Sequence, residues 1–415
     1  MPEVSALPLP HMSLREVTMK RSWQEAKRVI DEQIRPLGTE KVTLEEALSR
    51  VLAEDIKAEH PIPYMATSAM DGYAVKSGDT PGRLRIAGEV YPGEMPPTLS
   101  EGEAYYVATG AFIPEGSDTV IRVEDARIEG NTLVVEERLQ PGEFVNPAGS
   151  EVKKGETVLE IGTLIDWRIL GLLAYLGRYQ ISVYQRPQVG VIITGEEIAE
   201  VHENPAPYRT RNSNIYMLKG LLKKEGAEAH YLGRVEDSVE AIKRTVEESV
   251  RSFHATVTVG GVSKGKKDFV KRALEELGAE ILITQTNVKP GRPFAFATLK
   301  GHPIFCLPGY PSATLVNALE FLIPAIRKMQ GMKDYQNRYA RFTATEEFRS
   351  RKGMVYFIRV NLKWRDGRLY AYSAGSQLTS NYRTSATCEG LLILPEEVER
   401  LKEGETAEGL ILSPV

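Results

Sequence analysis

Residues 255–278 read ATVTVGGVSKGKKDFVKRALEELG. The first five residues are small or β-branched, as in a buried strand, whereas apolar side chains recur at helical spacing from Lys267 to Leu277. Gly260 and Gly261 separate the two parts and supply the backbone freedom of a tight turn. This stretch therefore predicts a strand, a glycine turn and a helix in immediate succession.

The same alternation extends over residues 184–332. The expected elements, in chain order, are strand 188–194 (QVGVIIT), helix 215–224, strand 228–233 (EAHYLG), a helix capped at Asp237, strand 255–261, helix 267–277, strand 280–286 (EILITQT), strand 303–309 (PIFCLPG) and a helix from Ser312. Alternating strands and helices form a mostly parallel sheet with helices on both faces. The prediction for this region is a three-layer α/β domain.

The remaining regions differ from the α/β region in their sequence patterns. Ser22-x-x-Glu25 and Thr43-x-x-Glu46 have the pattern of capping boxes that open short amphipathic helices, and residues 165–176 are again helical. Short β-rich runs separated by Pro and Gly follow the first helices, and alternating strands end the chain. The expected domains are 14–60 with 142–183 (helical, discontinuous), 61–141 (inserted, β-rich), 184–332 (α/β) and 337–415 (small, all-β).

Composition limits the class of protein. A chain of 415 residues is long enough for two to four domains, and a net charge of −4 argues against a protein that coats nucleic acid or an anionic membrane. The two cysteines, Cys306 and Cys388, support neither a disulfide framework nor a thiolate zinc site. No signal peptide or membrane span is recognisable, so we expect a soluble, cytoplasmic protein.

The suggestive loops of the α/β region all follow expected strands. They are TGEE (194–197), GGVSKGKKD (260–268), KPGRP (289–293) and LPGYPS (307–312). Ligands of open α/β sheets bind beyond the carboxyl ends of the strands, so we expect these loops to share a site. Backbone N–H groups and lysines in 260–268 favour an oxyanion, although an ordinary turn with a solvated basic face is the alternative.

Acidic and basic side chains in these loops indicate binding sites for a metal cation and for an oxyanion. Glu196 and Glu197 could hold a hard cation such as Mg²⁺, or form a solvated acidic turn. Asp268 could join them, or cap its helix. Two prolines brace the turn that presents Lys289 and Arg292, an arrangement suited to an oxyanion.

Two further loops are less specific. LPGYPS enters a helix whose unpaired N–H groups would form a second anion pocket, or is a plain strand-to-helix connection. In the β-rich insertion, SAMDGYAV (68–75) and ATGA (108–111) have the small, polar and turn residues of ligand loops. Asp71 could equally serve the turn amides around it.

The ordered motifs SAMDGYAV, ATGAFIPEGSD, TGEEI, GGVSKGKKDF, KPGRPFAF and LPGYPSA resemble those of the molybdopterin molybdenumtransferase (MoeA) family, which includes the C-terminal part of gephyrin. The resemblance covers nearly the whole chain. It implies an elongated homodimer with four domains per subunit, among them a three-layer, MogA-like α/β domain with a mostly parallel sheet and a small C-terminal β-barrel domain. It also implies insertion of molybdate, or tungstate, into adenylated molybdopterin with release of AMP.

The resemblance assigns residues to roles. Asp268, Glu197 and Lys289 would be catalytic, and Glu196, Glu197 and Asp268 would bind Mg²⁺. The residues that would contact the substrates are Ser68, Asp71, Thr109, Gly260, Gly261, Ser263, Pro290, Gly291, Arg292, Pro308, Gly309, Pro311 and Ser312.

The chain departs from the family pattern at four places. Ala66 stands where the family typically has Asp, Gly149-Ser150-Glu151 replaces Gly-Glu-Asp, Glu196 is a longer first acid, and Gln285 replaces a common Lys. These changes put catalysis in question and keep two alternatives open. One is a weakened paralogue that carries or scaffolds molybdopterin; the other is an adenylyltransferase of molybdopterin, against which the added β domains argue.

Overall fold

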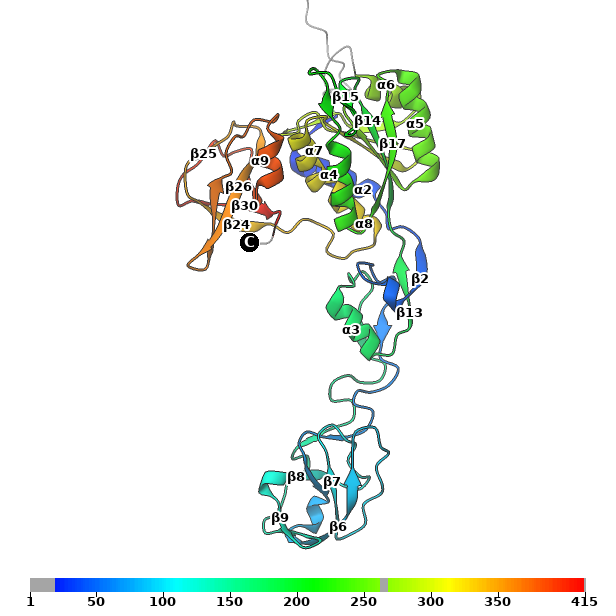
Figure 1. Cartoon of the computed structure of the whole chain (residues 1–415), viewed down its shortest axis with the longest axis vertical. Coiled ribbons are helices and arrows are strands. Elements are labelled where there is room, and N and C mark those ends of the chain that lie inside the picture. The colour runs from blue at the N-terminus through cyan, green and yellow to red at the C-terminus, as the bar shows by residue number, and fades with distance from the viewer. Residues whose placement is uncertain (1–18, 262–267, 414–415) are drawn as a thin grey trace, which may run out of the picture. The chain divides into compact units, whose positions relative to one another are not determined.

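The computed structural model describes residues 19–261 and 268–413 (Figure 1). It divides into two compact units, one comprising the chain up to Ala53, Gly162–Trp167 and the chain from Gln180 onward, the other Glu54–Ile161 and Arg168–Tyr179. In the described part of the chain no helix is long and apolar enough to cross a membrane.

The first unit is built on a six-stranded sheet. Its strand order is β17 (Glu228–Val235), β14 (Gln188–Thr194), β18 (Ala255–Val259), β23 (His302–Leu307), β22 (Ala295–Leu299) and β19 (Glu280–Ile283). All neighbours pair in parallel except β22, which is antiparallel to both β23 and β19. The mostly parallel sheet is confirmed, although β22 was not expected from the sequence.

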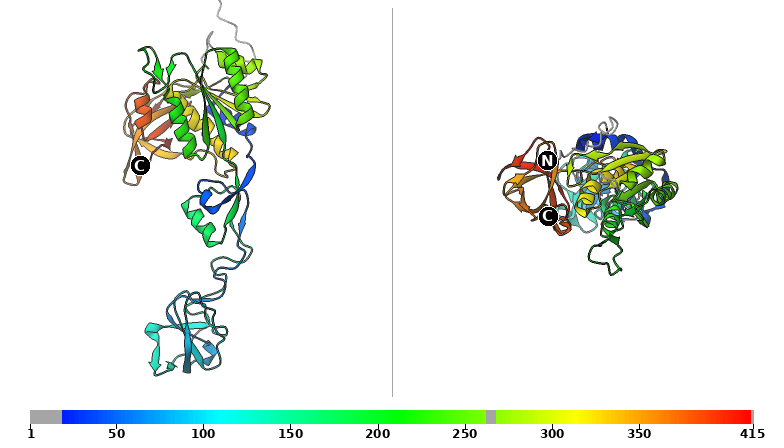
Figure 2. Two further views of the ribbon diagram at one scale, coloured as in Figure 1. Left: turned by 45° about the vertical axis from the view of Figure 1, so that its right-hand side comes forward. Right: turned by 90° about the horizontal axis from the view of Figure 1, so that it is seen from above.

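Alternate residues of β14 face opposite layers, which places helices on both faces of the sheet (Figure 2). Val189, Val191 and Ile193 pack in one core, and Ile192 lies in the other. The first core is covered by α2 (Trp23–Gln33), α4 (Asn214–Lys224), α7 (Pro311–Asn317), the π-helical Ala318–Leu322 and α8 (Ile323–Met329). The second is covered by α5 (Val239–Ser252) and α6 (Phe269–Glu276).

Capping decides where these helices begin. Ser22 and Glu25 form the predicted capping box of α2. The prediction that Asp237 caps α5 was wrong, because the hydroxyl of Ser238 accepts from Ala241 N at 3.2 Å and the helix starts one residue later. Thr43 opens only a single 3₁₀ turn, Leu44–Glu46, rather than a helix. The left-handed backbone of Ser49, with φ of 62°, is incompatible with continuing it.

The C-terminal part of the first unit is a closed barrel. Strands β26 (Val355–Arg365), β27 (Arg368–Ser373), β24 (Ala340–Ala344), β30 (Thr406–Ile411) and β28 (Gly390–Leu394) pair in that order, and β28 returns to β26. Helix α9 (Tyr382–Thr387) precedes β28. An additional strand, β21 (Val288–Lys289), pairs in parallel with β26 and so joins the KPGRP turn to the barrel. The predicted small β-barrel is therefore confirmed.

The second unit contains a separate six-stranded sheet. Its order is β8 (Thr119–Arg122), β5 (Gly72–Val75), β7 (Glu103–Val107), β6 (Gly82–Val90), β10 (Thr132–Val135) and β9 (Arg127–Glu129). Ala74, Val90 and Val107 pack in its interior. The β-rich character of this region is as predicted. Helix α3, expected at 165–176, spans Trp167–Tyr175.

Candidate functional site

The carboxyl ends of β14, β18 and β23 bring three loops together. Gly260 N donates to Leu307 O at 3.0 Å, which ties the turn after β18 to the end of β23. Gly260 has φ of 96°, and a methyl group there would lie 2.6 Å from Thr194 O. A methyl group on Gly309 would lie 3.7 Å from the Cα of Gly260. Backbones approach so closely here that glycine is required at Gly260.

The acidic residues lie near this edge in different settings. Glu196 and Glu197 are exposed, and the carboxylate of Glu197 folds back over Gly195. Asp268 is half-buried and caps α6, because its Oδ1 accepts from Lys271 N at 3.2 Å. Among the residues that the structure describes, no group of three or more His, Cys, Asp or Glu side chains is placed to hold a metal ion. Ser263 lies outside the described residues.

The KPGRP turn presents two cations. Lys289 is exposed, with Nζ 3.4 Å from Tyr356 Oη and 4.9 Å from the centroid of that ring. A cation above an aromatic face is stabilised there while its outer side stays accessible. Arg292 is also exposed. The amide oxygen of buried Gln285, in the orientation that satisfies the amide, accepts from Arg292 Nη2 at 2.9 Å and from Arg292 Nε.

Gln285 therefore holds the guanidinium of Arg292. A lysine in its place would set a second positive charge against that group. The glutamine that replaces the lysine common in the family at this position therefore supports a cation of the nearby KPGRP turn.

The LPGYPS loop turns into α7. Tyr310 caps the helix, and its carbonyl accepts from Ala313 N and Thr314 N, both at 2.9 Å. Because Pro311 has no N–H, Ser312 is the remaining residue of the first turn whose N–H could meet an anion. The hydroxyl of Ser312 is buried against α9, where it donates to Asn381 O at 3.3 Å.

Three buried polar residues were missed by sequence reasoning, two of them bonded to these loops and one in the barrel. Asn214 donates to Gly309 O at 2.7 Å, and Asn317 donates to Gly291 O at 2.9 Å. Arg359, only 2% exposed in β26, has Nε and Nη1 without a hydrogen-bond partner among the described residues. The signal in the sequence was a lone polar residue inside an apolar run, in ATLVNALEF for Asn317 and VYFIRVNL for Arg359.

The loops of the second unit form their own cluster. Asp71 Oδ1 accepts from Thr109 N at 2.6 Å and from Thr109 Oγ1 at 2.9 Å. The hydrogen bond from the Thr109 backbone is the main reason that the pKa of Asp71 lies below its usual value. Gly110 N donates to Ser68 O at 2.8 Å, so Ser68, Asp71 and Thr109 lie together, and Asp71 serves turn amides.

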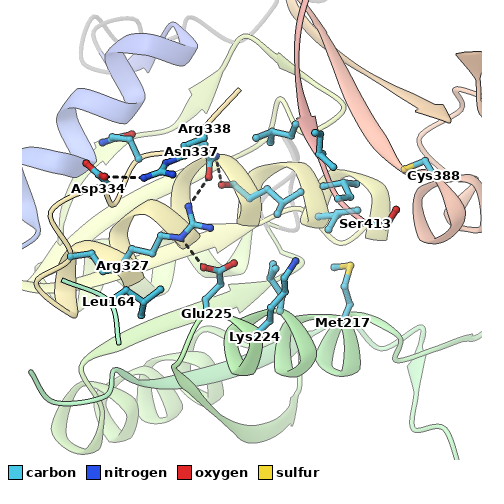
Figure 3. A pocket seen from close by; sticks show the side chains of 18 of the residues that line it. Leu164, Met217, Lys224, Glu225, Arg327, Asp334, Asn337, Arg338, Cys388 and Ser413 are labelled. Atoms are coloured by element: carbon cyan, nitrogen blue, oxygen red, sulfur yellow. Dashed lines mark hydrogen bonds and ion pairs between the residues drawn. The ribbon is translucent and has the colours of Figure 1, made fainter. Parts of the chain in front are cut away.

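A cavity of about 880 Å³ lies elsewhere in the first unit (Figure 3). Helices α4 and α8, the segment 332–338 and α9 contribute to its lining. Its charges pair with one another: Arg327 Nε lies 2.7 Å from Glu225 Oε2, and Arg338 Nη2 lies 2.9 Å from Asp334 Oδ2. None of the predicted site residues lines it. We therefore place the candidate site at the glycine and cationic loops.

Fold and loops together define a multidomain α/β protein with glycine-rich and cationic loops beside one edge of its sheet and a C-terminal barrel. Family models match in three consecutive parts: the MoeA N-terminal region (domain I and II) over residues 21–177, the probable molybdopterin binding domain over 190–328 and the MoeA C-terminal region (domain IV) over 341–412. The chain belongs to the MoeA family of molybdopterin molybdenumtransferases, which act in molybdenum cofactor biosynthesis.

Individual relatives agree. A molybdopterin molybdenumtransferase of Nostoc sp. is 33% identical, over 86% of this chain and 85% of its own length. The protein of the same name from Bacillus subtilis is 30% identical over 90% of each chain. Among solved structures, a molybdopterin biosynthesis MoeA protein from Pyrococcus horikoshii is 28% identical with a TM-score of 0.81, covering 95% of this chain and 99% of that one.

Proposed function

We propose that this chain inserts molybdenum, supplied as molybdate, into adenylated molybdopterin, with cleavage of the pyrophosphate bond and release of AMP. Tungstate is the alternative oxyanion. The observation that carries the proposal is the close packing of glycine turns at the carboxyl edge of the sheet, together with the cationic KPGRP turn held by the helix that follows LPGYPS, in a member of this family.

The charges of the substrates explain the cations. Two unit negative charges 4 Å apart repel by about 4 kcal/mol at an effective dielectric constant of 20. A molybdate dianion and a pyrophosphate therefore need positive groups between or beside them. Lys289 and Arg292 are exposed, and each is held by one neighbour, Tyr356 or Gln285. We assign these two cations to the oxyanion side of the site.

The acidic residues of the site are suited to bind a metal cation that arrives with the substrate. Mg²⁺ keeps several waters and commonly uses one or two carboxylates together with substrate phosphates. Glu196, Glu197 and Asp268 fit that role, whereas their arrangement does not fit a cage built by protein alone. When bound, Mg²⁺ would neutralise phosphate charge. The part of the chain in this step is to hold and orient the ion through Asp268 and Glu197.

We further propose that the active form is a homodimer, in which the loops with Ser68, Asp71 and Thr109 from one copy complete the site of the other. These loops have the small, polar and turn residues of ligand loops, and Asp71 and Thr109 are exposed beside the buried Ser68. Light scattering combined with AMP release tests this. A stable monomer with full turnover would contradict it.

Mixing the purified protein with adenylated molybdopterin, Mg²⁺ and either oxyanion, and following AMP, tests the proposed reaction. Release of AMP that depends on molybdate or tungstate is the expected result. Tight binding of adenylated molybdopterin without AMP release would instead support the second candidate, a molybdopterin carrier, which Ala66 favours.

A further inference from the structure

Two buried asparagines hold the site loops from inside the protein. Asn214, the first residue of α4, is 7% exposed and donates from Nδ2 to Gly309 O at 2.7 Å. Asn317, the last residue of α7, is 0% exposed and donates from Nδ2 to Gly291 O at 2.9 Å. One carbonyl in LPGYPS and one in KPGRP are thus turned inward.

A third group works beside them. The hydroxyl of Thr314, which is also fully buried, donates to Pro308 O at 2.6 Å. Two consecutive carbonyls of LPGYPS, those of Pro308 and Gly309, are therefore captured from within.

Because these carbonyls point inward, the N–H groups of the residues that follow them point outward. In a trans peptide the C=O and the following N–H point in opposite directions. The N–H groups of Gly309, Tyr310 and Arg292 therefore point away from the buried side chains of Thr314, Asn214 and Asn317 that hold the carbonyls. These three residues are exposed, and within residues 19–261 and 268–413 no protein acceptor is found for their N–H groups. Successive backbone N–H groups without a protein acceptor, such as those of Gly309 and Tyr310, suit an anion.

The side-chain amides of Asn214 and Asn317 are only partly hydrogen-bonded within the described part of the chain. Oδ1 of Asn214 and Oδ1 of Asn317 are buried without a hydrogen-bond partner among the described residues. A buried acceptor without a partner destabilises a fold, whereas an apolar side chain of similar size would not. Each amide nevertheless supports one carbonyl of a site loop.

We infer that Asn214 and Asn317 are positioning residues, which aim the N–H groups of Tyr310 and Arg292 at a tetrahedral oxyanion. The oxyanion is either molybdate or the substrate phosphate. Neither asparagine touches the ligand; each acts through a glycine carbonyl. The inference rests on the proposed function, since it assigns residues to the same site.

The test replaces the amide by an apolar group of similar size. Asn214→Leu and Asn317→Leu should each raise the molybdate concentration for half-maximal AMP release by about tenfold or more, with the maximal rate reduced less than about threefold. Their melting temperatures should change little, because each substitution removes one unpaired amide oxygen but also leaves one loop carbonyl without its donor. Thr314→Val, which is nearly isosteric, should act in the same direction by about threefold.

Asn212→Leu is the matched control. Asn212 is buried at 2% exposure two residues before Asn214, but it bonds to Tyr231 Oη at 3.1 Å rather than to a site loop. It should lose stability without changing the oxyanion dependence. The inference is overturned if the Asn214, Asn317 and Thr314 variants keep the wild-type dependence on molybdate.

Calorimetry separates this inference from the proposed function. If the wild type releases no AMP, the proposed reaction fails, and molybdate and AMP are then titrated into the wild type and each variant. Weaker binding of molybdate identifies the metal oxyanion as the ligand of the N–H groups, and weaker binding of AMP identifies the phosphate. Unchanged affinity for both in every variant that folds overturns the inference.

Discussion

The two ends of the α/β sheet differ in how completely their polar atoms are hydrogen-bonded. At the amino end, His302 Nε2 lies 2.8 Å from Thr256 Oγ1, which lies 2.7 Å from Ser249 Oγ, and Gln188 N donates to His254 Nδ1 at 3.0 Å. These groups satisfy one another. At the carboxyl end, amide oxygens and loop N–H groups are left without protein partners among the described residues. The protein itself satisfies the polar groups of the amino end, whereas at the carboxyl end we propose that a ligand meets the loop N–H groups.

The largest effect is expected at the carboxyl end. Asp268→Asn should slow AMP release by about 10² or more, because one preorganised electrostatic contact to the cation on the phosphates is lost. Asn can still accept from Lys271 N, so the helix cap remains. Steady-state kinetics and a melting curve decide between the two roles. An unchanged rate with a lowered melting temperature would leave Asp268 as a cap only.

At the amino end the expected effect is on stability against acid. Burial lowers the pKa of His302 to about 4, so the folded protein keeps this ring neutral while the unfolded chain protonates it near pH 6.5. A depressed folded pKa means that stability is lost as pH falls below 6.5. Between pH 7 and pH 5 this histidine should cost about 2 kcal/mol of unfolding free energy.

His302→Gln checks that value, because glutamine can bond to Thr256 without titrating. Urea unfolding at pH 7 and pH 5 should show a smaller acid loss in this variant than in the wild type. His60→Gln, in the other unit, is the control. If the unfolding free energy falls equally between pH 7 and pH 5 in the wild type and in His302→Gln, the neutral, buried state assigned to His302 at the amino end is wrong.

The next effect concerns the cation of the KPGRP turn. Lys289→Gln keeps the length and removes the charge, so the molybdate concentration for half-maximal insertion should rise about tenfold, or about 1.4 kcal/mol. Binding of adenylated molybdopterin should fall less, because Arg292 and the loop N–H groups remain. Separate titrations of the two ligands measure both. A collapse of pterin affinity with unaltered oxyanion dependence would move Lys289 to the pterin side.

The smallest effect should come from Gln285. Gln285→Leu removes the acceptor of two hydrogen bonds from Arg292 and should weaken molybdate binding about threefold, because these bonds only position the cation and its charge remains. Titration calorimetry measures it. Gln285→Lys restores the residue that is common in the family. A gain in turnover would show that the missing lysine matters more for catalysis than the support that Gln285 gives to Arg292.

Local patterns predicted what local forces decide. Strand and helix periodicity gave the mostly parallel sheet, and the Ser22 box gave the start of α2. Strand β22 was missed because it directly follows the proline-braced turn, where the sequence resembles a continuing loop. The cap of α5 was misassigned between adjacent residues, since Asp and Ser cap equally well.

The roles of Asn214 and Asn317 could not be found in this way. Which carbonyl a buried amide captures depends on loops that are far away in sequence: Asn214 lies 95 residues from Gly309, and Asn317 lies 26 residues from Gly291. Such pairings are set by tertiary packing. The sequence showed only that polar residues interrupt apolar runs, and the family motifs drew attention to the loops themselves.

The pairing of β21 with β26 limits how this chain can be divided. Lys289 stands opposite Tyr356 in that ladder, and Val355 N donates to Asn287 O at 2.9 Å. A truncated protein that ended before the barrel would leave the backbone of Lys289 without its neighbouring strand and its ammonium group without Tyr356. The barrel is thus no detachable module, and the α/β portion produced alone would lack an anchored lysine.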